Sequence, residues 1–451
     1  MPVLVLLLAR AGSRPKIAPR ADIRYGDTQA ARNCRSLLNL QQNDSSVIGS
    51  RLVFHFGGYD PVSPMKTYLR FVRELQRFRQ AWSVTSSASA PSVATDRAKW
   101  RIVSNGPNWR VETDHQLFRW DDIMAVYARR PVWWRLPMGL LAFADFVAGG
   151  ALLGYARTNW RYALFFLYPY LLLLMMVFAS CYAGEFAART SGSIAIGIAA
   201  GVLALIAFYL GPGRWTYLQI AFDDWIFSRS YIRHNDPELE RRLDAAADEI
   251  ISAAHARSVD EILLLGHSLG AVLAVDVLDR ALRREPDLGS RGPRLALVTV
   301  GSSILKIGLH SAAGRLRDAL ARVSRSPGIF WVDYQALTDV MNFYKTDPVR
   351  ECGLEPTGRP IIRIVRISHM LEPESYRRVR RNLYRLHCQF VSGNERRAAY
   401  DYFMLLCGPL PAEQQARSPE GAASEIGDDG RLLHAAAPSA YPGRTHVTLG
   451  G

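Results

Sequence analysis

Residues 262–284 read ILLLGHSLGAVLAVDVLDRALRR, and this stretch decides the fold. A short apolar run leads straight into the sequence GHSLG at 266–270, and a run rich in Ala, Val and Leu follows. This order is typical of a buried strand, a tight turn and a helix. The turn exposes the serine hydroxyl above a sheet, beside a helix N-terminus that favours developing negative charge. We therefore predict that Ser268 is a nucleophile.

Further strands and helices are predicted on both sides of this motif. The pattern predicts strands at 52–56, 100–103, 109–112, 295–300, 329–334 and 360–367, and helices at 65–80, 237–256 and 271–284. Asp236 is the expected N-cap of the helix at 237–256, and residues 84–95 are expected to form a loop. Alternating strands and helices indicate a mostly parallel sheet with helices on both faces. Together with the serine motif, they predict an α/β-hydrolase fold.

A membrane module interrupts this fold. Residues 162–183 carry no charged side chain and would span about 33 Å as a helix, and 194–210 form a second, shorter uncharged run. We expect two transmembrane helices there, joined by residues 184–193. Residues 138–155 are apolar but contain Asp145, so we expect an interfacial segment. The hydrolase domain would then combine 51–135 with 215–409, around a membrane module at 136–214.

The composition of the chain limits which ligands and binding partners are expected. The chain has 451 residues, a net charge of +14 and five widely spaced cysteines. The cysteines show neither a disulfide framework nor metal-ligand spacing, and no nucleic-acid-binding motif accompanies the charge. We expect no metal, cofactor or nucleic acid, and an anionic membrane surface as partner. Residues 1–50 and 410–451 lack periodicity or are rich in Ala, Gly, Pro and Ser, and are expected to be disordered.

A serine nucleophile needs a base, and the base needs an acid that orients it. In this fold both follow the serine, acid first. Asp339 and Asp347 follow the strand predicted at 329–334, whereas Asp333 lies within it and is the weaker candidate. For the base, His369 directly follows the last predicted strand and His387 lies further on.

An oxyanion hole should come from the residue after the serine, Leu269, and from a loop after an early strand. The sequence HFGGY at 55–59 ends the first predicted strand and is similar to the His-Gly-Gly element of lipases and esterases. Gly57 and Gly58 would let backbone N–H groups approach the substrate oxygen. We expect Gly57, Gly58 and Leu269 to form the oxyanion hole.

Several stretches resemble a group of bacterial membrane proteins with a lipase-like α/β-hydrolase domain. They are FHFGGYDP at 54–61, the turn at 266–270, TDV at 338–340, LHCQFVSGN at 386–394 and YDYF at 400–403. The resemblance covers about residues 51–409. Lipase-like hydrolases often carry a Trp eight residues before the acid, as Trp331 stands before Asp339 here. In the group the element around His387 recurs, so the resemblance favours Asp339 as acid and His387 as base.

These observations predict a membrane-anchored serine hydrolase that cleaves an ester or thioester by acyl-enzyme chemistry. A lipid or other acyl ester is the expected substrate. An acyltransferase with the same triad, or a non-catalytic membrane scaffold with a degenerate hydrolase fold, is the alternative. Because the glycine loop precedes the membrane module and Ser268 follows it, the chain should cross the membrane an even number of times. Basic residues flanking the two spans predict an inner-membrane protein with the hydrolase domain in the cytoplasm.

Overall fold

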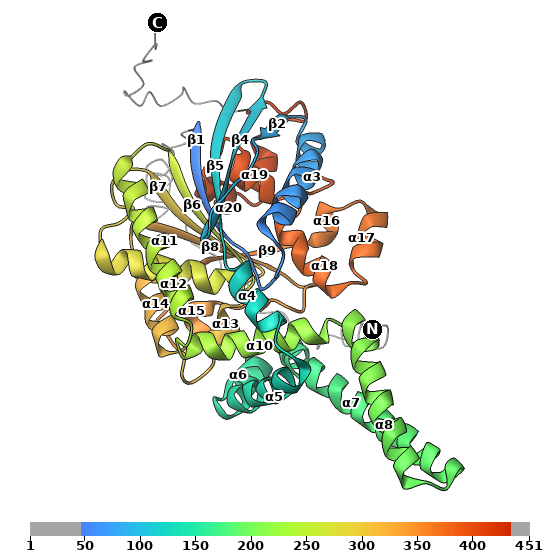
Figure 1. The fold of residues 1–451 in the computed structure, drawn as a ribbon. Helices are drawn as coiled ribbons and strands as arrows, with labels where there is room; N and C mark the ends of the chain where they lie inside the picture. Colours follow the sequence, from blue (N-terminus) through green and yellow to red (C-terminus); the bar gives the residue numbers. More distant parts are fainter. Residues whose placement is uncertain (1–46, 434–451) are drawn as a thin grey trace, which may run out of the picture.

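Strand β6 (Glu261–His267) is buried along its whole length and lies near the centre of a nine-stranded sheet (Figure 1). The computed structural model describes residues 47–433. The strand order is β2-β4-β5-β1-β6-β7-β8-β9, with β3 beside β4. Neighbours from β5 to β9 are parallel, whereas β4 runs antiparallel to β5, β2 and β3. The other strands are β1 (Ser50–Phe56), β2 (Thr85–Ala88), β3 (Ser92–Val93), β4 (Arg97–Gly106), β5 (Trp109–Phe118), β7 (Arg294–Val300), β8 (Ile329–Ala336) and β9 (Ile361–Val365).

The pairing of β1 with β6 joins two distant parts of the chain. Leu52 of β1 lies opposite Ile262 of β6 in parallel register. The chain leaves the sheet after β5 and returns to it at β6; between them lie a helical insertion, residues 121–232, and a helix at 237–256 that packs against the sheet. A mostly parallel sheet with helices is therefore observed as predicted, and strands on both sides of the insertion build it.

Alternate side chains of the central strands bury into two separate cores, because successive residues of a strand point to opposite faces. Ile262 and Leu264 belong to the core beneath α11 (Pro237–Ala256), α12 (Gly270–Arg284) and α14 (Gly314–Arg325). Leu263 and Leu265 belong to the core beneath α3 (Pro64–Trp82), α19 (Tyr402–Cys407) and α20 (Ala412–Arg417). Burial on both faces is why β6 reads as an unbroken apolar run.

Local sequence signals predicted some elements correctly and others incorrectly. Asp236 caps α11 as predicted, since its side chain accepts a hydrogen bond from Leu239 N at 3.1 Å. The loop expected at 84–95 instead contains β2 and β3, because these Ser-rich segments pair with β4 at the edge of the sheet. The remaining short helices outside the insertion are α13 (Ile304–Gly308), α15 (Pro348–Glu351), α16 (Ile367–Met370), α17 (Pro373–Val379), α18 (Leu383–Cys388), η1 (Gln389–Val391) and η2 (Gly421–Ser424).

The insertion is helical and projects from the sheet domain (Figure 1). Its helices are α4 (Asp121–Ala128), α5 (Val132–Ala148), α6 (Ala151–Thr158), α7 (Trp160–Ser191), α8 (Ile194–Leu210), α9 (Pro212–Trp215) and α10 (Leu218–Ile232). Within residues 47–433, only α7 is by itself long and apolar enough to cross a membrane, and α8 is shorter. The apolar segment expected at 138–155 is a pair of helices, α5 and α6, bent by 66° at Gly149 and Gly150.

Helices α7 and α8 form a close antiparallel hairpin. A Cβ placed on Gly184 would lie 2.8 Å from the carbonyl oxygen of Gly197, so the two backbones touch. Small residues permit such contact between helices in a membrane. The prediction of a linker at 184–193 is wrong for most of these residues. Helix α7 continues to Ser191, and only Gly192 and Ser193 form the turn between the two helices.

The C-terminal segment corrects another prediction. Residues 410–433 are not disordered: Leu410, Ala412 and Ala416 are buried in the second core, as are Ile426 and Leu432. Small and apolar side chains pack there, although their composition resembles that of a flexible tail. The predicted disorder at 1–46 and 434–451 lies outside the described residues.

A buried ion pair holds this segment. Arg51 of β1 bonds Glu261 of β6 at 2.7 Å, and its guanidinium also donates to the carbonyls of Gly408 and Leu410. Glu261 in turn accepts a hydrogen bond from Ala412 N at 2.9 Å. Because a buried charge needs partners on all its polar atoms, the chain around 408–412 is fixed against the sheet.

Candidate active site

Ser268 stands at the turn between β6 and α12 in a strained backbone conformation. Its φ of 55° lies in the left-handed region, which residues with a side chain rarely adopt. Hydrogen bonds from Ser268 N to Val300 O and from Ser303 N to Ser268 O, both 3.1 Å, hold the turn in place. The strand–turn–helix expected from the sequence is thus present, with the strain that exposes a nucleophilic serine.

The glycines of the motif are required by close packing. A Cβ on Gly266 would lie 2.5 Å from Ala271 Cα, and one on Gly270 would lie 2.0 Å from Phe56 O. The first contact lets strand and helix approach each other at the turn. The second lets the loop after β1 cross directly over the start of α12.

Asp339 and His387 form a buried pair. The Nδ1 atom of His387 lies 2.7 Å from Oδ2 of Asp339, and both side chains are almost completely buried. Asp339 follows β8 in a loop where its other oxygen accepts a hydrogen bond from Met341 N at 2.9 Å. His387 comes from α18, which lies in a separate segment after β9. The structure therefore brings together the two residues that the resemblance favoured.

The other candidates for acid and base serve elsewhere. His369 is exposed on the short helix α16 and does not line the cavity around Ser268. Asp347 caps α15, where its side chain accepts hydrogen bonds from Val349 N and Arg350 N. Asp333 is buried in β8 and bonded to Thr299 and Gln335; burial raises its pKa to about 6.

Ser268 and His387 line one cavity without being hydrogen-bonded to each other. Among the described residues, Nε2 of His387 has no hydrogen-bond partner. The Ser268 hydroxyl lies 3.4 Å from the hydroxyl of Ser303. In unliganded sites the bond between nucleophile and base is often long, and it tightens when substrate binds.

The glycine loop after β1 lies against Ser268. A Cβ on Gly58 would come within 2.9 Å of Ser268 Cβ, whereas a Cβ on Gly57 would meet nothing within 4 Å. Gly57, Gly58 and Leu269 all line the cavity. Within residues 47–433, the backbone N–H groups of Gly58 and Leu269 donate no hydrogen bond, which leaves both donors for a ligand.

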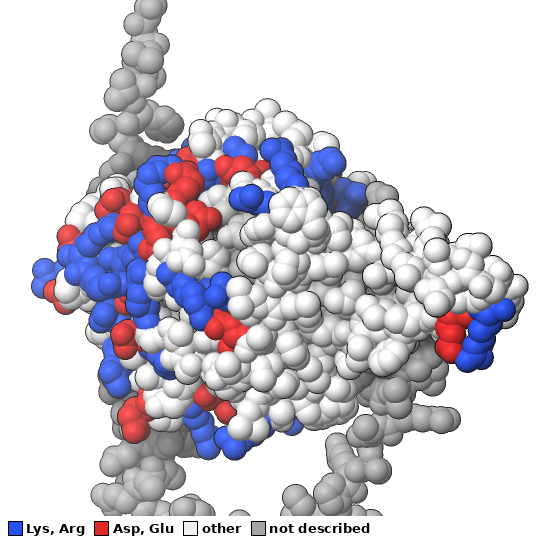
Figure 2. Space-filling view, turned by 60° about the horizontal axis from the view of Figure 1, so that its bottom comes forward, with Lys and Arg blue, Asp and Glu red and all other residues white. Residues whose placement is uncertain are grey.

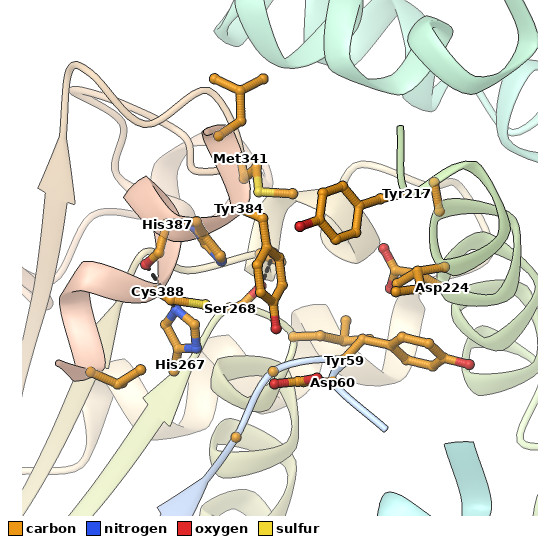
Figure 3. A pocket seen from close by; sticks show the side chains of 18 of the residues that line it. Tyr59, Asp60, Tyr217, Asp224, His267, Ser268, Met341, Tyr384, His387 and Cys388 are labelled. Atoms are coloured by element: carbon orange, nitrogen blue, oxygen red, sulfur yellow. Dashed lines mark hydrogen bonds between the residues drawn. The ribbon is translucent and has the colours of Figure 1, made fainter. Parts of the chain in front are cut away.

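The cavity beside Ser268 has a volume of about 380 Å³, within the range of small-molecule sites. In Figure 3, His387 and His267 lie on one side of Ser268, and Tyr217, Asp224 and Tyr59 lie across the cavity. Its walls therefore combine residues from the sheet domain with residues from the helical insertion.

Burial keeps two histidines near Ser268 neutral. Burial, with a contribution from His387, holds the pKa of His267 well below its usual range, and its ring packs 4.6 Å from that of His387. Burial, with a contribution from Arg70, lowers the pKa of His55 to about 3. Neither ring therefore adds a positive charge to the cavity.

Several lining residues were not anticipated from the sequence. The buried ammonium of Lys306 forms an ion pair of 2.5 Å with the partly buried Asp224, beside the ring of Trp225. The hydroxyl of Tyr59 is buried without a hydrogen-bond partner among the described residues. Cys388, next to the base, is a thiol whose pKa burial raises to about 11. Tyr59 and Cys388 lie in stretches that the sequence analysis singled out, but no motif marks Lys306 or Asp224, because only the fold brings them to Ser268.

Among residues 47–433, no group of three or more His, Cys, Asp and Glu side chains is arranged to hold a metal ion. Comparisons of the chain with protein-family models, curated proteins and solved structures find no match.

Proposed function

We propose that this chain is a membrane-anchored serine hydrolase with an α/β-hydrolase fold, which cleaves an ester or thioester. The observation that carries the proposal is the combination at one cavity of Ser268, strained at the end of a central strand, with the buried His387–Asp339 pair. The same assignment would make the chain a member of the bacterial membrane-protein group that its sequence resembles.

The arrangement suits acyl transfer. Ser268 Oγ attacks the carbonyl carbon, and Nε2 of His387 takes the hydroxyl proton. Asp339 accepts the hydrogen bond from Nδ1 and stabilises the imidazolium that forms. The backbone N–H groups of Leu269 and the Gly57–Gly58 loop stabilise the developing oxyanion.

Completion of the reaction uses the same groups in reverse. The imidazolium of His387 gives its proton to the leaving oxygen or sulfur as the bond to the acyl group breaks. A water molecule, deprotonated by His387, then attacks the acyl-serine and releases the acid. If another hydroxyl or amine replaced this water, the chain would be an acyltransferase with the same residues.

The helical insertion supplies the anchor in this proposal. The underside of the molecule is a broad surface almost without Lys, Arg, Asp or Glu, with charged residues gathered at its edges (Figure 2). On α7 and α8, Phe178, Tyr182 and Ile198 are more than 60% exposed. Large apolar side chains exposed together are expected to face lipid. We assign α7 and α8 as a two-span hairpin, with α5 and α6 at the interface.

The first turns of α7 pack in the core of the sheet domain. The membrane-spanning part of α7 can therefore start only after them. Tyr162, Ala163 and Phe166 are buried in the first core. The rest of the helix, 169–191, is about 34 Å long at 1.5 Å per residue, enough to cross the hydrocarbon core. Helix α8, at about 25 Å, is short for that distance, which local thinning of the bilayer accommodates.

Charge supports a cytoplasmic hydrolase domain. Arg130, Arg157 and Arg161 lie before the hairpin span, whereas Arg189 near its turn is paired with Glu185. The segment of α17 and α18 beside the cavity adds five exposed arginines: Arg377, Arg378, Arg380, Arg381 and Arg385. Positive charge favours the cytoplasmic side and its anionic lipids. We propose the bacterial inner membrane, with the Gly192–Ser193 turn outside.

Labelling with a fluorophosphonate probe tests the proposed chemistry. The wild-type chain in membranes should be labelled covalently, and the Ser268→Ala variant should not. The matched control is Ser303→Ala, which removes a neighbouring hydroxyl and should leave labelling in place. Equal labelling of wild type and Ser268→Ala, or no labelling of the folded wild type, would leave the scaffold function as the better account.

A further inference from the structure

One stripe of the long apolar helix α7 lines the cavity around Ser268. Arg161, Leu164, Phe165 and Tyr168 line it at helical positions i, i+3, i+4 and i+7, and Tyr162, which is also part of the first core, lines it as well. Residues with this spacing share one face of a helix. The opposite side of the same turns, including Phe166, is buried in the first core. The helix that we assign to the membrane is thus also a wall of the reaction cavity.

The facing wall comes from the chain just after the hairpin. Tyr217, Ile220 and Ala221, at the start of α10, line the cavity. The hydroxyl of Tyr168 donates a hydrogen bond of 2.7 Å to Thr216 O, which ties the two walls together. The cavity therefore lies at the base of the hairpin, where both of its helices join the sheet domain (Figure 1).

An aromatic contact spans this region. The rings of Tyr217 and Tyr384 are stacked with centroids 5.4 Å apart. Tyr217 belongs to the insertion and Tyr384 to α18, the helix that carries His387. In Figure 3 these two side chains lie at the same side of the cavity as Met341. The contact joins the membrane-proximal wall to the element that supplies the base.

The lining stripe of α7 continues outward as exposed apolar surface. Leu171 is 50% exposed and Met175 is 67% exposed, and they continue the spacing set by Leu164 and Tyr168. An apolar chain lying along α7 would keep contact with apolar side chains from the lipid-facing part of the helix to the cavity. Transfer of such a chain costs little, since it exchanges one apolar environment for another.

We propose that the substrate is an acyl ester of a bilayer lipid, whose acyl chain enters from the membrane along α7 between α10 and α18. This inference rests on the proposed hydrolase function. The ester carbonyl reaches Ser268 while the chain lies against Leu164, Phe165 and Ile220. After attack by Ser268, the alcohol part of the lipid leaves with the proton from His387, and water later releases the fatty acid.

The test compares two substrates on the full chain reconstituted in vesicles. One is a dioleoyl phospholipid of the bilayer, and the other is p-nitrophenyl acetate dissolved in water. The variant Leu164→Trp narrows the cavity wall, and Ile220→Trp narrows the facing wall. The matched control is Leu174→Trp, the same substitution on the same helix at a side chain that is 50% exposed and outside the cavity.

The ratio of lipid to acetate hydrolysis should fall about tenfold in Leu164→Trp, because the larger side chain fills space in which the acyl chain would lie. In Leu174→Trp it should match wild type. Fluorophosphonate labelling shows which variants keep a folded site. If Leu164→Trp loses labelling but Ile220→Trp keeps it, the ratio is measured in Ile220→Trp instead. The lipid route is overturned, while the hydrolase function stands, if the wild-type chain is labelled but hydrolyses only the acetate. The same holds if the ratio of lipid to acetate hydrolysis is equal in all variants. An unlabelled wild type overturns the hydrolase function as well.

Discussion

Asp339 and His387 lie 2.7 Å apart between Oδ2 and Nδ1, although 48 residues separate them in the chain. The bond occupies one ring nitrogen of His387 and leaves Nε2 for proton transfer. A buried carboxylate in this position holds the imidazole in one orientation and tautomer. The role of His387 and Asp339 can therefore be tested by substituting these two residues while Ser268 is left unchanged.

Substitution of either member of the pair should abolish turnover while the protein stays folded. We expect Asp339→Asn to lower kcat for a soluble ester by roughly 10⁴-fold and His387→Gln to lower it by at least as much, as loss of the orienting acid or of the base does elsewhere. His369→Gln and Asp347→Asn are the matched controls and should retain wild-type kcat. A normal rate in His387→Gln would exclude this histidine as the base.

The glycine loop predicts a contrast between adjacent residues. In Gly58→Ala, the new methyl group would lie 2.9 Å from Ser268 Cβ, so the nucleophile or the loop must move. We expect kcat/KM to fall by roughly 100-fold, the cost of a displacement of about 1 Å at a reacting group. Gly57→Ala, whose methyl group meets nothing within 4 Å, should lose much less. Comparable losses in both variants would mean that contact with Ser268 is not the cause.

Asp333 predicts a pH dependence of stability rather than of catalysis. Burial raises its pKa from 3.8 to about 6, so the folded state holds a proton that the unfolded state releases. The stability from this carboxyl group is present below about pH 4 and lost as pH rises through about 6, on the order of 3 kcal/mol. Asp333→Asn does not titrate. Thermal unfolding of both proteins between pH 4 and 7 should show the wild type losing stability relative to the variant; a constant difference would contradict this.

Reporter fusions test the topology. Gly58 and Ser268 line one cavity, so the chain between them must cross the membrane an even number of times. Alkaline phosphatase, active only in the periplasm, should be active when fused after Ser191 and inactive after Arg233. Green fluorescent protein, which folds in the cytoplasm, should give the opposite result at both sites. Phosphatase activity after Arg233 would place the hydrolase domain outside or break the hairpin.

Elements with a strong local signal were predicted well. The sequence placed β6, the turn at Ser268 and α12, because an apolar run, a glycine pair and a periodic helix are local features. It also placed α8 at its observed bounds, since Ser193 and Gly192 interrupt the helical pattern there. The continuation of α7 to Ser191 was missed, because Glu185 and Arg189 reduce the apolar character that marked the span.

Elements that depend on partners were predicted poorly. Strands β2 and β3 exist because β4 supplies their hydrogen bonds, and nothing in the Ser- and Ala-rich sequence requires them. Residues 410–433 are ordered because Arg51 and Glu261, far away in the chain, bind the carbonyls and the N–H group of the segment around 408–412. A segment whose composition is typical of flexible chain becomes ordered when its backbone groups supply hydrogen bonds to buried charged side chains elsewhere.

The sequence by itself determined that Ser268 would stand at a tight turn between a strand and a helix, since all three are encoded within one short stretch. It also determined that a long apolar helix interrupts the sheet, because length and lack of charge are local properties. Only the tertiary structure decided that His387 rather than His369 meets Asp339, and that Leu164 and Ile220 wall the cavity. Such contacts depend on how β1, β8, α7 and α18 pack around β6, and packing between distant segments leaves no periodic signal in the chain.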